Sequence, residues 1–141
     1  MALSKAAGDS ACDRDGWTPL HHACRLGDTE VAMGFIAAGG DVNGRTNYDM
    51  TPLHLACSFG TRKMVSMLIA AGGRASVDVK NTLGFTPLHC ASQKGNIGAV
   101  RLLLEAGATP DLRAKYGARA QDITNKAEIW LMLKMSRRAR G

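Results

Sequence analysis

The chain has 141 residues and a formal net charge of +6, with 21% charged and only 5% aromatic residues. This length has room for one elongated core and not for a second domain. No run of 18 or more apolar residues occurs, and the first residues lack the apolar run of a signal peptide, so neither a membrane span nor secretion is expected. We therefore expect an intracellular protein located in the cytoplasm, with the nucleus as the alternative.

The first segment, residues 1–12, is predicted to form a partial N-terminal cap. Leu3, Ala6 and Ala7 share one face of a helix, and Gly8 can end that helix. A repeated pattern follows this segment.

A tetrapeptide, Thr-Pro-Leu-His, occurs three times, beginning at Thr18, Thr51 and Thr86. The intervals of 33 and 35 residues are typical of a stacked helical repeat. In each copy the threonine hydroxyl can cap the first turn of a helix, and the proline suits the first helical position. A degenerate fourth copy has Arg119 in place of the threonine.

The tetrapeptides and the glycines that follow them predict two helices in every unit and no central sheet. The first helices are predicted to begin near Thr18, Thr51, Thr86 and Arg119, and the second helices to cover about residues 30–38, 63–71, 97–106 and 127–136. Left-handed glycines are expected to end the first helices at Gly27, Gly60 and Gly95, and the second helices at Gly39, Gly72 and Gly107. Asp49 replaces a turn glycine, and Asp tolerates a positive φ.

An alanine stands two residues after the histidine of each copy, at Ala23, Ala56 and Ala91, and the whole pattern resembles the ankyrin repeat, T-P-L-H-x-A. The resemblance runs from about residue 13 to the end of the chain. It implies an all-α ankyrin-repeat solenoid of stacked helix-turn-helix units with short β-hairpin-like turns. The implied units are repeats at 13–45, 46–80 and 81–113, a degenerate C-terminal capping repeat at 114–136 and a basic tail at 137–141.

Four histidines and four cysteines raise the alternative of a zinc site or a catalytic Cys/His pair. These residues recur once per repeat, however, whereas zinc ligands lie together in one compact loop. The resemblance implies that His21, His54 and His89 tie each helix start to the neighbouring turn by hydrogen bonds. Cys24 and Cys57 occupy equivalent positions of neighbouring repeats, where a small buried residue is expected. The distance between two repeats is too long for a disulfide. We therefore predict no metal, no cofactor, no disulfide and no enzymatic activity.

The residues outside the repeat scaffold lie in the turns before each tetrapeptide and at the ends of the first helices, which form a concave binding surface in the proteins that this chain resembles. The residues predicted to bind a partner are Arg14, Trp17, Arg25, Arg45, Tyr48, Met50, Phe59, Lys80, Leu83, Phe85, Lys94 and Tyr116. Aromatic and Arg side chains are enriched at binding hot spots, and basic side chains favour acidic flanks on a partner. We predict a non-enzymatic interaction module or adaptor whose protein partner has apolar anchors and acidic flanks. The alternative for any one aromatic is packing against the next turn.

The net positive charge favours a second class of function, a nucleic-acid-associated or nuclear regulatory protein that uses its basic surface and tail. Four basic residues without an acidic one lie near the end, at Lys134, Arg137, Arg138 and Arg140. No nucleic-acid-binding motif is present, so this alternative ranks below protein binding.

Two irregularities interrupt the pattern. Segment 73–80 is two residues longer than its counterpart in the first unit, and such insertions often lie on the binding face, although a neutral bulge is the alternative. In the last unit Ile129, Met132 and Leu133 are predicted to pack inward. Trp130 is then left toward the end of the stack, where it is covered by the basic tail, half-buried against its own repeat, or free to form a weak self-association surface.

Overall fold

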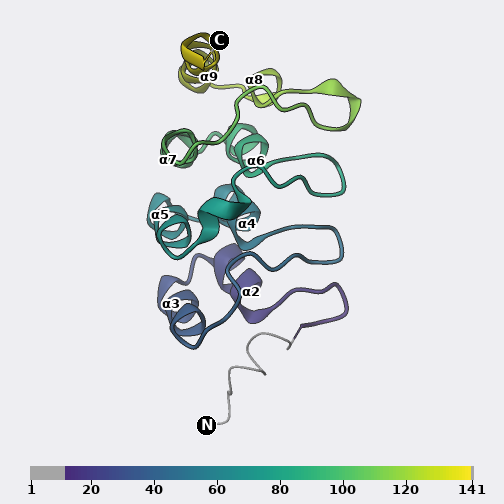
Figure 1. The fold of residues 1–141 in the computed structure, drawn as a ribbon, viewed down its shortest axis with the longest axis vertical. Helices are drawn as coiled ribbons and strands as arrows, with labels where there is room; N and C mark the ends of the chain where they lie inside the picture. The colour runs from purple at the N-terminus through teal and green to yellow at the C-terminus, as the bar shows by residue number, and fades with distance from the viewer. Residues whose placement is uncertain (1–11, 141) are drawn as a thin grey trace.

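The computed structural model describes residues 12–140, which form pairs of helices stacked along one axis (Figure 1). The pairs are α2 (Pro19–Leu26) with α3 (Thr29–Ala37), α4 (Pro52–Phe59) with α5 (Arg62–Ala70), α6 (Pro87–Lys94) with α7 (Ile97–Glu105), and α8 (Ala120–Ile123) with α9 (Ala127–Arg140). Two short 3-10 helices, η1 (Gly73–Ser76) and η2 (Lys115–Gly117), lie in the connections. No strand occurs among residues 12–140, which contain one isolated antiparallel bridge between Arg113 and Arg119. The predicted all-α repeat fold is confirmed.

The helix boundaries follow the sequence prediction closely. The four first helices begin at the expected caps, and the second helices begin within one residue of the expected positions. The exception is the end of α9, which continues to Arg140 instead of stopping at residue 136. Apart from Cys12, the predicted N-terminal cap lies outside the described residues.

Each tetrapeptide starts its helix with reciprocal hydrogen bonds. In the second repeat the Thr51 hydroxyl accepts from the His54 backbone N–H (3.2 Å), and the Thr51 backbone N–H donates to His54 Nδ1 (3.2 Å). Because Nδ1 accepts, Nε2 carries the ring proton and donates it to the carbonyl oxygen of Phe85 in the next turn (2.8 Å). His21 and His89 reach the carbonyls of the turns that follow them in the same way. The expectation that these histidines join neighbouring repeats is confirmed.

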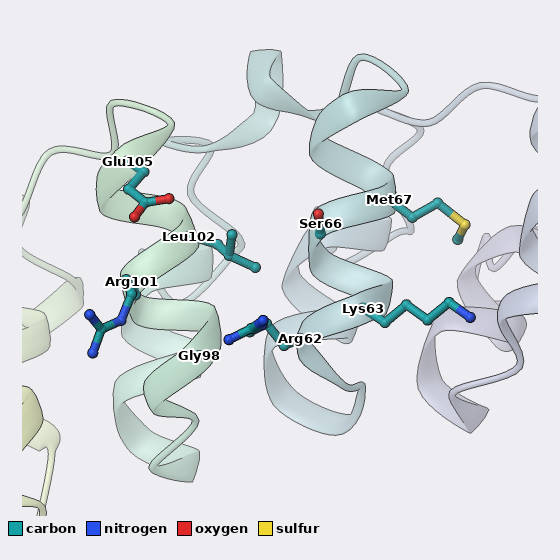
Figure 2. Close-up of a pocket in the computed structure, with 8 residues that line it drawn as sticks. All are labelled: Arg62, Lys63, Ser66, Met67, Gly98, Arg101, Leu102 and Glu105. Atoms are coloured by element: carbon teal, nitrogen blue, oxygen red, sulfur yellow. The ribbon is translucent and has the colours of Figure 1, made fainter.

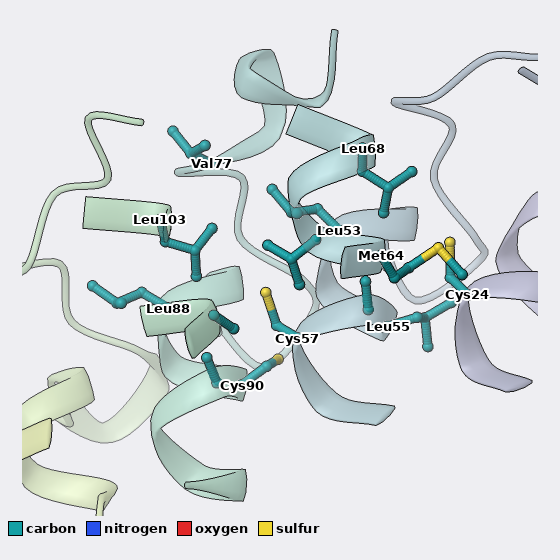
Figure 3. Close-up of a cluster of buried hydrophobic side chains, with 14 of the residues drawn as sticks. Cys24, Leu53, Leu55, Cys57, Met64, Leu68, Val77, Leu88, Cys90 and Leu103 are labelled. Carbon is teal, nitrogen blue, oxygen red and sulfur yellow. The ribbon is translucent and has the colours of Figure 1, made fainter. Parts of the chain in front are cut away.

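The core runs through all repeats between the two layers of helices. Leucines of the first helices meet leucine, methionine and valine side chains of the second helices, as Figure 3 shows around Leu53, Met64 and Leu68. Cys24 and Cys57 are fully buried in this core, as expected for small apolar residues. Every repeat therefore depends on its neighbours to cover its apolar surface.

The predicted glycine conformations hold at all positions except one. Gly27 and Gly95 have φ of 74° and 73°, and Asp49 has φ of 62°. Gly60 is extended, with φ of −93°, so the prediction of a left-handed residue is wrong there. At Gly60 the reason for glycine is close approach, because an added Cβ would lie 2.9 Å from the carbonyl oxygen of Ala56.

The insertion at 73–80 forms η1, which packs against α5 and α4 on the helical side of the stack and away from the turn tips (Figure 1). Just after η1, Asp78 accepts hydrogen bonds from the backbone N–H (2.9 Å) and the hydroxyl (2.8 Å) of Thr109 in the next repeat. The Ser76 hydroxyl donates to Asn43 of the preceding repeat. The insertion therefore joins three repeats by hydrogen bonds, and a contribution of this segment to a binding face stays a prediction.

Candidate functional site

The four turns before the first helices project from one side of the stack in a row (Figure 1). A backbone hydrogen bond closes each turn at its base, as between the Thr46 N–H and the Met50 carbonyl (3.0 Å). Further backbone bonds join each turn to the next, as between the Thr82 N–H and the Tyr48 carbonyl (3.1 Å) and between the Lys115 N–H and the Leu83 carbonyl (2.9 Å). The turns therefore form one continuous edge.

The central residue between the hydrogen-bonded ends of each turn occupies the same position in every repeat. This position holds Asp15, Tyr48, Leu83 and Tyr116, and each is followed by a residue with positive φ. Tyr48, Leu83 and Tyr116 are 60%, 54% and 95% exposed. We call these three residues the tip row.

The residue two positions after each tip points back toward the helices. The Trp17 ring lies 5.0 Å from the His22 ring, and the Phe85 ring stacks on His89 at 5.4 Å. Both aromatics, and Met50 at the equivalent position, are partly buried against the core. The expectation that Trp17 and Phe85 lie outside the core is therefore wrong, because the positive-φ residue before each of them turns its side chain inward.

Two of the predicted basic contacts also stabilise the scaffold. Arg45 Nη2 donates to the carbonyl oxygen of Lys80 in the next repeat (3.3 Å), and Lys80 Nζ donates to that of Arg113 (2.9 Å). Arg45 also lies 3.5 Å from the Asp49 carboxylate. These contacts hold neighbouring turns together, so each of the two side chains already makes hydrogen bonds within the chain.

The ends of the inner helices α2, α4 and α6 add a second exposed group. Leu26 and Phe59 are more than half exposed, and Lys94 Nζ lies 5.4 Å from the centre of the Phe59 ring. Of the residues predicted to bind a partner, those that are exposed are Arg14, Arg25, Arg45, Tyr48, Phe59, Lys80, Leu83, Lys94 and Tyr116. The remaining three, Trp17, Met50 and Phe85, are partly buried.

Three of the histidines and the buried cysteines have pKa values shifted toward the neutral form, as is typical of a protein core. Burial lowers the pKa of His54 to about 4 and also lowers the pKa values of His21 and His89, so these rings are neutral near pH 7. Burial raises the pKa of Cys24 to about 12 and that of Cys90 to about 11. A buried neutral thiol is a poor nucleophile. Within residues 12–140 no three His, Cys, Asp or Glu side chains gather as metal ligands.

A hollow of about 610 Å³ lies on the opposite side of the stack, between α5 and α7 (Figure 2). Arg62 and Leu102 reach into it, and Glu105 lies near one end. Its lining combines opposite charges and includes none of the residues predicted to bind a partner. The tip row and the ends of the inner helices remain the candidate site.

The fold and this site define a helical repeat solenoid, in which each unit packs only on its neighbours and presents its turns along one edge. A family model of ankyrin repeats in three copies matches residues 2–81 and 35–114, and the chain therefore belongs to the ankyrin-repeat family. A search of curated proteins found no match. Ankyrin repeats generally mediate protein–protein interaction, and the family is typically non-enzymatic. None of the helices described is both long and apolar enough to span a membrane.

Proposed function

We propose that the chain binds a protein partner along the tip row and the neighbouring ends of the inner helices. The observation that carries this proposal is the tip row, where three successive repeats expose a large apolar or aromatic side chain at the same position. Contiguous exposed apolar side chains on a folded protein mark interaction sites. Tyrosine suits such a site because its ring is apolar and its hydroxyl can still donate a hydrogen bond.

The chemistry along this edge favours a particular kind of partner. Asp15 occupies the first tip, whereas the other three tips are aromatic or apolar, so the two ends of the edge differ in chemistry. Exposed basic side chains stand beside the tips, including Arg14 and Lys115. A polypeptide segment with apolar anchors at successive turns and acidic residues between them complements this pattern. Location in the cytoplasm or nucleus stays a prediction, as does the absence of a cofactor.

A pull-down from the source cell tests the proposal when the wild type is compared with two matched variants. The test variant is Tyr48→Ala, Leu83→Ala, Tyr116→Ala, and the control is Met33→Ala, Leu131→Ala, whose exposed side chains lie on the outer helices. A true partner is retained by the wild type and the control and is lost from the test variant. With that partner purified, each tip substitution should weaken binding by roughly 1 to 3 kcal/mol in calorimetry. Retention of every captured protein by the folded test variant would refute the tip row as the site.

The alternative of nucleic-acid binding makes a different prediction. Binding through phosphates falls steeply as salt rises and depends little on apolar tips. Filter-binding titrations at two salt concentrations, with the wild type and the tip-row variant, separate the two functions. Tight, salt-dependent binding of a duplex or single strand that the tip substitutions leave unchanged would favour the alternative.

A further inference from the structure

The outer helices α3, α5, α7 and α9 expose different positions at the two ends of the stack. In the two middle outer helices, the third, fourth and seventh residues are fully buried, at Met64, Val65 and Leu68 and at Ala99, Val100 and Leu103. Figure 3 shows Met64 beside Cys24 of the preceding repeat. Some of these positions therefore face the preceding repeat and the others face the following one.

The last outer helix, α9, shows which of these positions faces the following repeat. In α9 the third and seventh residues, Ile129 and Leu133, are fully buried, but the fourth residue, Trp130, is 39% exposed. The fourth residue is fully buried in the other three outer helices. Trp130 therefore stands where a following repeat would pack. A hollow of about 370 Å³ lies beside it, lined by Thr124, Asn125, Lys126 and Ala127.

The first outer helix shows the converse arrangement. Its fourth residue, Ala32, is fully buried, whereas its third residue, Val31, is 44% exposed. The third residues of the later outer helices, Met64, Ala99 and Ile129, have no exposed surface. Val31 therefore stands where a preceding repeat would pack. The first outer helix therefore exposes its third residue, and the last outer helix exposes its fourth residue.

The charges at the two ends are also opposite. Residues 13–45 contain five acidic and three basic residues, whereas residues 114–141 contain two acidic and seven basic residues. The exposed apolar residues share this contrast, since Glu30 precedes Val31 and Lys134 Nζ lies 4.7 Å from the centre of the Trp130 ring. Two C-terminal ends facing each other would bring like charges together, whereas a C-terminal end facing an N-terminal end pairs opposite charges.

We propose that this surface takes a second copy of the chain, with the C-terminal end of one molecule stacked on the N-terminal end of the next. Trp130 then packs against Val31 of the neighbouring copy. Val65 and Val100, at the same position of α5 and α7, are buried toward the next repeat in the same way. Such a contact joins two different surfaces and does not close, so assemblies grow beyond the dimer as concentration rises. The contact is separate from the tip row, which stays open to a partner.

Sedimentation equilibrium of the full chain tests this proposal across a range of concentrations and at two salt concentrations. The average mass of the wild type should rise steadily with concentration, and less steeply at high salt. Trp130→Ser and Val31→Lys should each weaken association by at least about tenfold, because Val31→Lys removes an apolar contact and places a like charge opposite the basic C-terminal end. Leu131→Ser is the matched control, because the fifth residue of an outer helix is exposed in every repeat. Thermal unfolding of each variant verifies that the monomer is folded.

Mixing the two variants gives the sharpest result. A Trp130→Ser molecule keeps its N-terminal end and a Val31→Lys molecule keeps its C-terminal end, so the mixture should form a heterodimer that neither variant forms alone. A folded wild type that is monomeric at every concentration would overturn the proposal. Association by the Val31→Lys variant alone that rises with salt would instead indicate pairing of two C-terminal ends and would equally overturn it.

Discussion

Acid should destabilise this protein well above the pH at which carboxylates protonate, and His54 is the main reason. Its pKa is about 4 in the folded chain, because burial disfavours the charged ring, whereas a histidine in the unfolded chain has a pKa of about 6.5. The folded state therefore binds fewer protons than the unfolded state between these two values. The stability that the neutral ring supports is complete above pH 6.5 and is lost as the pH falls from there through about 4.

The size of the effect follows from 1.36 kcal/mol for each unit between the pH and the unfolded pKa. At pH 5 the unfolded ring is almost fully charged and the folded ring almost fully neutral, so His54 alone should lower the free energy of unfolding by about 2 kcal/mol relative to pH 7. His21 and His89 act in the same direction, because burial lowers their pKa values too. The loss is a large part of the stability of a typical domain.

Urea titrations followed by circular dichroism at pH 7 and pH 5 measure this loss. His54→Gln is expected to be less stable than the wild type at pH 7, because it changes a buried hydrogen-bonded ring, yet it should lose about 2 kcal/mol less between the two pH values. The difference between the losses of the wild type and the variant isolates the contribution of His54 from that of the carboxylates, which both proteins share. Equal losses in the wild type and the variant would refute the assignment of the acid sensitivity to His54.

Asp78→Ala removes both hydrogen bonds to Thr109 and should lower the free energy of unfolding by about 1 to 3 kcal/mol in urea, and an unchanged urea midpoint would contradict the bridging role of the insertion. Trp17→Ala should lower the melting temperature by several degrees and Tyr48→Ala should not, since only Trp17 packs against the core; equal melting temperatures would place both outside it. A thiol reagent should label Cys12 quickly in the native protein and the three buried cysteines only on unfolding, and fast labelling of all four thiols would disprove their burial.

The sequence was sufficient for the helix starts because their causes are local. Thr51 and the proline after it determine the cap within one turn of chain, and the same chemistry recurs in each copy. Gly60 shows the limit of this reasoning, since Thr61 already caps the next helix and the linking residue is extended. A glycine can stand at a helix end for its conformation or for its small size, and the letter alone does not distinguish the two.

The site was predicted less completely because exposure in the turns depends on geometry over two residues. Tyr48 points outward, whereas Phe85, which looks equally suited to a binding surface in the sequence, lies two positions beyond a tip and packs inward. The contrast between the two ends of the stack also required the structure. The sequence places Trp130 toward the end of the stack and leaves its burial open, and its correspondence with the buried Val65 and Val100 emerged only from the helix boundaries.

In the turns the backbone makes the contacts between repeats, and the tip side chains stay exposed. The carbonyl groups of Tyr48 and Leu83 accept hydrogen bonds from the next turn, while their side chains lie in solvent. Since the backbone supplies the inter-repeat contact at the tip, the stack does not depend on which side chain stands there, and Asp15 occupies the same position in the first repeat. The tip side chains can therefore change with little effect on stability, whereas a change two residues later alters the packing against the core.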